Sequence, residues 1–99
     1  MPSELALILG PSPAPGSVRI WYELPREQWV SVCVFDAEGR RVVTLVSNVE
    51  TPGRHEVEWD GTIHGERRAG TYFCRITADN RSRESVVLLL AEAEAVPLS

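Results

Sequence analysis

Hydrophobic and polar side chains alternate along most of this chain. The segment 17–25 reads SVRIWYELP and the segment 28–36 reads QWVSVCVFD, and in each one a set of alternate positions is apolar throughout. A period of two residues is typical of a β-strand with one face in a core. No window of eleven or more residues has the clean stripe of an amphipathic helix. The pattern therefore predicts an all-β protein.

Turn-forming residues divide the chain into seven such segments. The Asp36–Arg40 stretch, Pro52-Gly53, Asp60-Gly61 and Asp79-Asn80 have the composition of turns. The predicted strands are 4–9, 17–24, 28–35, 41–46, 54–59, 70–78 and 83–90. Seven short strands at this spacing predict an antiparallel, seven-stranded β-sandwich of the immunoglobulin or fibronectin-III class. One sheet would contain 4–9, 17–24 and 54–59, and the other 41–46, 28–35, 70–78 and 83–90.

The chain of 99 residues is short enough to form one domain with one core. Residues 1–16 supply its first strand and a loop rich in proline and glycine. Residues 17–90 form the body of the sandwich, and residues 91–99 form a C-terminal tail.

Four residues are predicted to have structural roles at the end of the core. Tyr72 stands two residues before Cys74, as in immunoglobulin-like sandwiches, where the Tyr hydroxyl bonds backbone upstream and fixes a corner. Trp59 is expected to cap the core. Asp60 is expected to accept hydrogen bonds from loop amides in the turn at Gly61.

The two cysteines fall on neighbouring predicted strands of one sheet but on opposite faces. Cys74 shares the core face with Tyr72 and Ile76, whereas Cys33 points outward. A disulfide needs Cα atoms within about 7 Å and converging Cβ vectors. We therefore expect both cysteines to be reduced, with Cys74 acting as a small core hydrophobe.

Composition narrows the class of function. The net charge is −4, so the basic surface of a nucleic-acid-binding protein is missing. The early apolar run 5–9 is too short for a signal sequence or a membrane span. We expect a cytoplasmic protein if the chain is complete, and a secreted or cell-surface protein if it is a domain of a longer one.

The stretch 54–66 holds two histidines and four acidic residues. A catalytic interpretation would use His55 or His64 as a base and Asp60 to orient it. Alternation instead places His55 on a strand face with Val57 and Trp59, which favours a structural role. Nucleophile, nucleotide and zinc motifs are missing, and the acidic turns lack the density of a calcium loop. We expect no catalytic residue, no metal and no cofactor.

Apolar residues occur where water is expected on the outer side of the second sheet. Trp29, Cys33, Phe35 and Phe73 have outward parity, and the run VVLLL at 86–90 does not alternate at all. A strand that is apolar on both faces is usually covered on both sides. We predict that this face docks a partner protein, which could be a second copy, a host protein or an assembly subunit. The predicted contact residues are Trp29, Cys33, Phe35, Phe73, Val87 and Leu89. Alternatively, the tail 91–99 or a loop at 47–53 folds over the face.

Four ordered blocks carry a resemblance to a known family. They are YELP at 22–25, VSVCVFDAEGR at 30–40, PGRHEVEWDG at 52–61 and GTYFCRI at 70–76. Over residues 13–90 the chain resembles the immunoglobulin-like domain of the flagellar hook-capping protein. It equally resembles related C-terminal modules of secreted bacterial proteins, including type IX sorting domains. Sorting modules of this kind end on a short basic strand, whereas an acidic and apolar tail follows Leu90 here.

The resemblance implies a non-enzymatic sandwich appended to something larger. It favours a structural or interaction module, with a cell-surface sorting or carbohydrate-binding module as the alternative. For sugar stacking the candidate is Trp21, which has outward parity on the first sheet.

Overall fold

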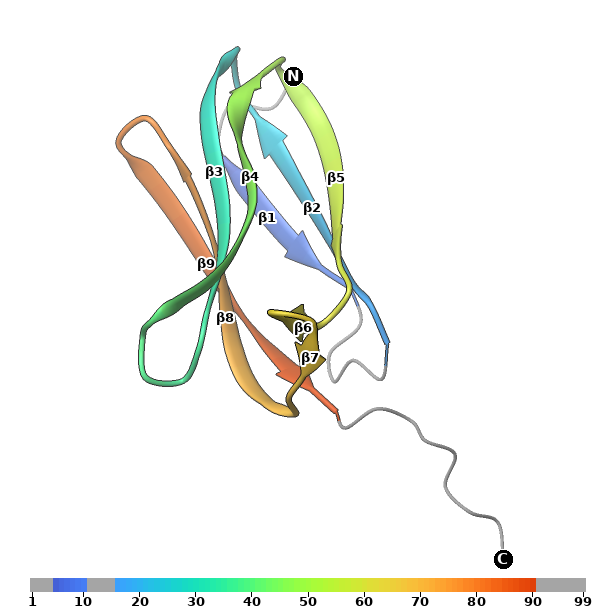
Figure 1. Ribbon diagram of the computed structural model, residues 1–99. Helices are drawn as coiled ribbons and strands as arrows, with labels where there is room; N and C mark the ends of the chain where they lie inside the picture. The colour runs from blue at the N-terminus through green and yellow to red at the C-terminus, as the bar shows by residue number, and fades with distance from the viewer. Residues whose placement is uncertain (1–4, 11–15, 91–99) are drawn as a thin grey trace, which may run out of the picture.

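The computed structural model describes residues 5–10 and 16–90, and these form two stacked antiparallel sheets (Figure 1). The strands are β1 (Ala6–Leu9), β2 (Val18–Leu24), β3 (Gln28–Phe35), β4 (Arg41–Glu50), β5 (Gly53–Trp59), β6 (Thr62–Ile63), β7 (Glu66–Arg67), β8 (Gly70–Ala78) and β9 (Arg81–Leu89). The three-stranded sheet has the order β1-β2-β5 and the four-stranded sheet the order β4-β3-β8-β9. The predicted all-β class and the predicted membership of both sheets are confirmed. The predicted tail 91–99 lies outside the described residues.

The strands number nine among the described residues, where the pattern predicts seven. The additional pair is the β6–β7 hairpin, in which Thr62 pairs with Arg67 and Ile63 with Glu66. His64 and Gly65 form its turn with φ angles of 53° and 82°. Strands of two residues are too short to show a period, so alternation could not reveal them.

Strand β4 is longer than predicted. Residues 47–50 were expected in a loop, but Gln28 pairs with Glu50 and Trp29 with Val49 at the end of this strand. Only two residues then separate β4 from β5, so the chain passes directly from one sheet to the other (Figure 1). The polar residues Ser47 and Asn48 suggested a loop, yet at a sheet edge they remain in the strand and face solvent. The alternative in which a loop at 47–53 covers the outer face is therefore wrong.

The core lies between the sheets and is built from the alternate apolar positions. Its buried members are Leu5, Val18, Ile20, Tyr22, Leu24, Val30, Val32, Val34, Trp59, Tyr72, Cys74, Ile76, Ala78, Val87 and Leu89. Burying one Val, Leu or Ile side chain stabilises a fold by about 1.5–3 kcal/mol, so this set supplies the main driving force for folding.

Trp59 and Tyr72, for which sequence analysis predicted separate structural roles, lie together at the end of the core. Trp59 is buried and packs edge-on against Tyr72, with ring centroids 5.4 Å apart. The Tyr72 hydroxyl donates to the backbone carbonyl of Arg68 at 2.8 Å, and the Trp59 indole N–H donates to that of Thr62 at 3.0 Å. Both buried rings therefore retain a partner for their polar atom.

The turn after β5 also follows the prediction. The Asp60 carboxylate accepts hydrogen bonds from the Thr62 hydroxyl at 2.7 Å and from the Thr62 N–H at 2.9 Å. These two bonds hold the pKa of Asp60 below its usual value. Gly61 has a φ of +85°, and a Cβ atom there would lie 2.2 Å from a guanidinium nitrogen of Arg67. The positive backbone angle requires glycine, whereas the Arg67 guanidinium, at the end of a flexible side chain, can shift to make room for a Cβ atom.

The cysteines lie on adjacent strands and face opposite sides of the four-stranded sheet. Cys74 is in register with Val34 in the core, whereas Cys33 is in register with Arg75 on the other side. Both are free thiols in the structure. Burial, with a smaller contribution from Cys33, raises the pKa of the Cys74 thiol to about 12.

Candidate docking face on the four-stranded sheet

The outer face of the four-stranded sheet is the side turned away from the core. Because paired residues of an antiparallel sheet point to the same side, the register assigns its members. They are Arg41, Thr44, Ser47 and Val49 on β4, Trp29, Ser31, Cys33 and Phe35 on β3, Thr71, Phe73, Arg75 and Thr77 on β8, and Ser82, Glu84, Val86 and Leu88 on β9.

Two of the predicted contact residues are on the wrong side of the sheet. Val87 is in register with Tyr72, is 2% exposed and belongs to the core, and Leu89 is buried with it. Val86 (52% exposed) and Leu88 face outward instead. The run VVLLL gives no alternation from which to choose a side, so only the pairing with β8 decides it.

One end of the outer face is apolar around Trp29. Its side chain is 47% exposed and lies in register with exposed Val49 on β4. Contact between these apolar side chains and water is unfavourable, and a partner that covered Trp29 and Val49 would remove this free-energy cost.

The other end of the outer face is a row of apolar side chains across three strands. Phe35, Phe73 and Val86 stand in register on β3, β8 and β9, and Leu88 follows on β9. Phe35 and Phe73 are half-buried by their neighbours. The Arg75 guanidinium lies 4.5 Å from the centroid of the Phe35 ring, at cation–π distance.

A polar belt separates the two apolar ends. It contains hydroxyl groups of Ser31, Ser47, Thr44, Thr77 and Ser82, together with Cys33 and the pair Arg75–Glu84. Arg75 and Glu84 are joined by a 2.9 Å ion pair. The outer face is thus two apolar clusters about 20 Å apart along β3, rather than the continuous patch that parity suggested.

Cys33 lies on the outer face as predicted, but it is only 6% exposed. Its Sγ is 3.2 Å from Ser31 Oγ and 3.7 Å from Thr44 Oγ1. A bulge between Val32 and Cys33 shifts the register with β4 at this point. The thiol is covered by its neighbours and presents little surface to a partner.

A shallow hollow of about 200 Å³ opens between the two apolar clusters. Its lining consists of Trp29, Ser31, Cys33, Phe35, Arg41, Arg75 and Thr77. The polar side chains of this lining are all able to donate a hydrogen bond, and none of them is a carboxylate.

Comparisons with known proteins define the fold more than the function. No protein-family model matches the chain, and no curated protein is similar to it in sequence. Among solved structures, PorU from Porphyromonas gingivalis, crystallised as a latent dimer, superposes with a TM-score of 0.66 at 19% sequence identity. The match covers 93% of this chain and 10% of PorU, so the chain spans about a tenth of that protein's length. At this identity the likeness supports the sandwich fold and nothing further.

The histidines do not form the pair with Asp60 that a catalytic interpretation requires. Asp60 is bonded to Thr62, and His64 lies in the β6–β7 turn. His55 instead stacks on Tyr22, with ring centroids 5.3 Å apart, and its Nε2 lies 2.7 Å from the carbonyl oxygen of Thr51. Within the described ranges no cluster of three His, Cys, Asp or Glu side chains is placed to hold a metal ion.

The carboxylate of Glu50 lies beside the stacked rings of Tyr22 and His55, and sequence analysis missed this contact. The Tyr22 hydroxyl donates to Glu50, and His55 Nδ1 lies 3.7 Å from the same carboxylate oxygen. Burial, followed by the bond to Glu50, raises the pKa of Tyr22. The three residues come from β2, β4 and β5, so they tie the β4–β5 crossover to the core. Glu50 was expected in a loop, and this hid the cluster.

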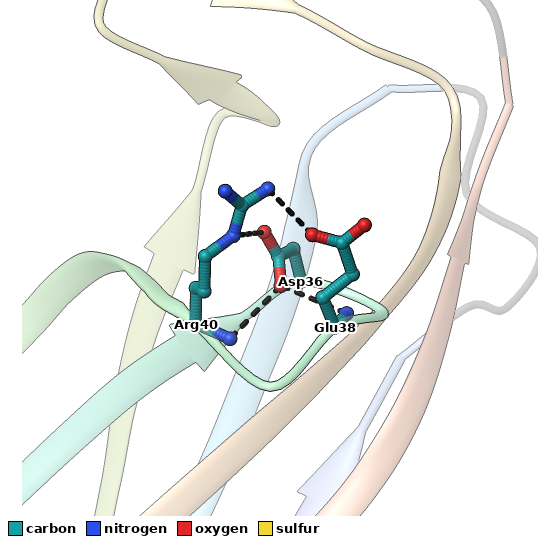
Figure 2. Close-up of polar contacts among 3 residues, drawn as sticks. All are labelled: Asp36, Glu38 and Arg40. Carbon is teal, nitrogen blue, oxygen red and sulfur yellow. Dashed lines mark hydrogen bonds and ion pairs between the residues drawn. The ribbon is translucent and has the colours of Figure 1, made fainter.

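The β3–β4 turn holds three charged side chains in contact with one another, those of Asp36, Glu38 and Arg40, as Figure 2 shows. One oxygen of Asp36 accepts the N–H groups of Glu38 and Arg40 at 2.9 Å each, and the other accepts Arg40 Nε at 2.9 Å. Arg40 also reaches Glu38 at 3.0 Å. The backbone N–H of Arg40 is the largest cause that keeps the pKa of Asp36 low. Each charged side chain of this turn has a partner within the turn. These contacts fix the connection between Phe35, the last residue of β3, and Arg41, the first residue of β4.

The described residues include no helix of the length and hydrophobicity that a membrane crossing requires.

Proposed function

We propose that this chain is a non-catalytic, immunoglobulin-like module that docks a partner protein through the outer face of its four-stranded sheet. The observation that carries the proposal is the location of exposed apolar side chains. Six large hydrophobic residues are exposed in the described ranges, and four of them lie on this face: Trp29, Val49, Val86 and Leu88. The other two are Ile8 on the three-stranded sheet and Leu90 after the end of β9. Exposed apolar surface gathered on one face is typical of interaction sites.

Two observations support the immunoglobulin-like assignment. The strands divide into three and four with the order of such sandwiches, and Tyr72 forms the corner hydrogen bond to Arg68. The likeness to about a tenth of PorU supports a module that occurs as one part of a larger chain. The resemblance of residues 13–90 to modules of bacterial hook-capping and secreted proteins supports the same role.

Trp29 is the residue on which docking should depend most. Tryptophan is enriched among residues whose truncation costs 2 kcal/mol or more of binding free energy, which is about a 30-fold loss of affinity. Its ring is exposed at the end of a strand within the face, with Val49 beside it.

A matched pair of variants tests the proposal. Trp29→Arg alters the outer face, whereas Ile8→Arg alters the opposite side of the sandwich at a residue of equal exposure (47% against 48%). The tagged chain is cross-linked in its native host, and the partner found with the wild type is then measured against both variants. We expect Trp29→Arg to bind at least tenfold more weakly and Ile8→Arg to bind as the wild type does.

Sedimentation of the purified chain distinguishes a second copy from another protein as the partner. A mass that doubles with concentration, and returns to the monomer in Trp29→Arg, assigns self-association. Equal partner binding by Trp29→Arg and the wild type, with no change of mass, would contradict docking through this face.

A cell-surface sorting or carbohydrate-binding module is the second candidate. Trp21 was the expected sugar-stacking residue, but its ring is half-buried against the backbone of Gly10, where a Cβ would approach it to 2.8 Å. Trp29, beside the hydroxyls of the polar belt, is the better stacking platform. Quenching of tryptophan fluorescence by neutral oligosaccharides, lost in Trp29→Ala and retained in Trp21→Phe, would favour this candidate.

A further inference from the structure

The outer face of the four-stranded sheet and the solvent-facing side of the three-stranded sheet carry net charges of opposite sign. Among the strand residues of the outer face, Arg41 and Arg75 are cationic and only Glu84 is anionic, which leaves one positive charge. The opposite face of the three-stranded sheet carries Arg19, Arg54, Glu23, Glu56 and Glu58, which leaves one negative charge. The whole chain has a net charge of −4, so the outer face is locally cationic on an acidic protein.

The positive charge is concentrated at the hollow between the apolar clusters. Arg41 and Arg75 line it on the two sides of β3, and Glu84 is not part of the lining. Arg75 is held in place by Glu84 at 2.9 Å and by the Phe35 ring. Arg41 is exposed and forms no ion pair with another residue of the described ranges. The Arg75 guanidinium is thus fixed in position, whereas the Arg41 guanidinium can pair with a ligand.

The other polar groups of the hollow suit an anion as well. Ser31 and Thr77 line the space, and their hydroxyl groups can donate hydrogen bonds to a ligand there. A carboxylate accepts several hydrogen bonds at once, and charge-assisted bonds to guanidinium are among the strongest in proteins. The Trp29 and Phe35 rings at the two ends reduce access of water to such a pair, which strengthens it.

Resting on the docking function proposed above, we infer that the partner presents an aspartate or glutamate side chain that enters this hollow and pairs with Arg41. Apolar residues on either side of that acid would cover the Trp29–Val49 cluster and the Phe35–Phe73 row. A hollow of about 200 Å³ has room for one carboxylate side chain.

A second copy that docks through the same outer face does not fit this site. Its outer face carries the same positive charge, and the acid it offers there, Glu84, is already paired with its own Arg75. Two such faces would oppose like charges. We therefore assign the site to a different polypeptide, which approaches with an acidic residue between apolar ones.

Two short peptides serve as probes of the site. Acetyl-Leu-Ser-Glu-Ser-Ala-Ser-Leu-amide and its counterpart with Gln in place of Glu are titrated into the ¹⁵N-labelled 99-residue chain at low salt, because seven extended residues span about 20 Å and place both Leu side chains and the acid on one side. We expect the Glu peptide to shift the amide resonances of Ser31, Arg41 and Thr77 and to bind at least threefold more tightly than the Gln peptide. The difference should disappear in Arg41→Gln, survive in Arg41→Lys, and remain intact in Arg19→Gln on the opposite face.

The outcomes separate this inference from the docking function itself. Equal binding of the two peptides by the wild type would overturn the acidic-residue inference. So would shifts of these resonances by digalacturonate but not by the Glu peptide, because the ligand would then be an acidic glycan. If Trp29→Arg loses the host partner while Arg41→Gln retains full affinity for it, docking stands and the inference fails. If Trp29→Arg and Arg41→Gln both lose the host partner and Arg41→Lys still binds it, the docking function and the acidic-residue inference both stand.

Discussion

The two outer faces of the sandwich rest on the same core but differ in what they present. The face of the three-stranded sheet alternates charged residues along β2 and β5, and Arg19 lies 3.7 Å from Glu56 across the strands. The face of the four-stranded sheet places Trp29 and Val49 at one end and Phe35, Phe73 and Val86 at the other. The first face is mainly charged, with Ile8 as its exposed large hydrophobic residue, whereas the second gathers Trp29, Val49, Val86 and Leu88.

The difference shows that folding alone does not require the apolar residues of the outer face. The three-stranded sheet holds its register with charged outward residues, because the inward positions Val18, Ile20 and Tyr22 supply the burial. An outward Trp29 adds little to that burial. This contrast supports the docking function that we propose for the outer face.

The largest change in stability is expected on β9, where neighbouring residues face the core and the outer face. Val87→Asp places a charge in the core, and we expect it to lower the free energy of unfolding by about 3 kcal/mol or more. Val86→Asp, one residue away and facing outward, should change it by less than about 0.5 kcal/mol. Urea unfolding measures both. Equal costs would mean that the assigned sides of β9 are wrong.

A change in the core should lower stability without altering either face. Tyr72→Phe removes the hydroxyl that donates to the backbone carbonyl of Arg68 at 2.8 Å, so this carbonyl loses its hydrogen-bond donor. We expect a loss of about 1–2 kcal/mol in the free energy of unfolding. Partner affinity per folded molecule should stay at the wild-type value, and a fall in that affinity would show that the corner shapes the docking face.

The ion pairs on the two faces should differ in strength. Arg75 binds Glu84 through two N–H groups, at 2.9 and 3.2 Å, and lies over Phe35, whereas Arg19 is 3.7 Å from Glu56 and both of those side chains are well exposed. We expect Arg75→Ala to cost about 1 kcal/mol of unfolding free energy and Arg19→Ala less than about 0.5 kcal/mol. Thermal unfolding at low and high salt checks this. A larger loss from Arg19→Ala would remove this contrast between the faces.

The smallest effect concerns two acidic turns, one between β3 and β4 of the four-stranded sheet and one after β5 of the three-stranded sheet. The pKa of Asp36 is lowered chiefly by the Arg40 N–H, and that of Asp60 chiefly by the Thr62 hydroxyl. Because both folded pKa values lie below the unfolded ones, the unfolded state binds more protons in acid. The stabilisation is thus complete above about pH 4–5 and is lost as the pH falls through the folded pKa.

Asp60 is exposed and Asp36 is partly exposed in a surface turn, so the change should be slight. Asp36→Asn and Asp60→Asn should each flatten the fall of the melting temperature between about pH 5 and 2. A steeper fall in either variant would contradict the assigned hydrogen bonds.

Sequence analysis predicted the sheets and part of the site for a physical reason. Alternation along 17–24 and 28–35 assigns each side chain to a face, so sheet membership, Tyr72 and Trp29 could be placed. The run 86–90 has no alternation, so Val87 and Leu89 were placed on the wrong side. The polar belt could not be foreseen either, because it arises only when β4, β8 and β9 are aligned on β3 in one register.

Hydroxyl-radical footprinting of Trp29 and Ile8 tests the central claim most directly. The two side chains are equally exposed in the isolated chain and lie on opposite faces of the sandwich. Oxidation is measured by mass spectrometry for the purified chain and for the same chain in its native host. Docking through the outer face predicts at least a fivefold slower oxidation of Trp29 in the host, with Ile8 unchanged. Trp29 oxidised as fast in the host as in isolation, or Ile8 alone protected, would contradict it.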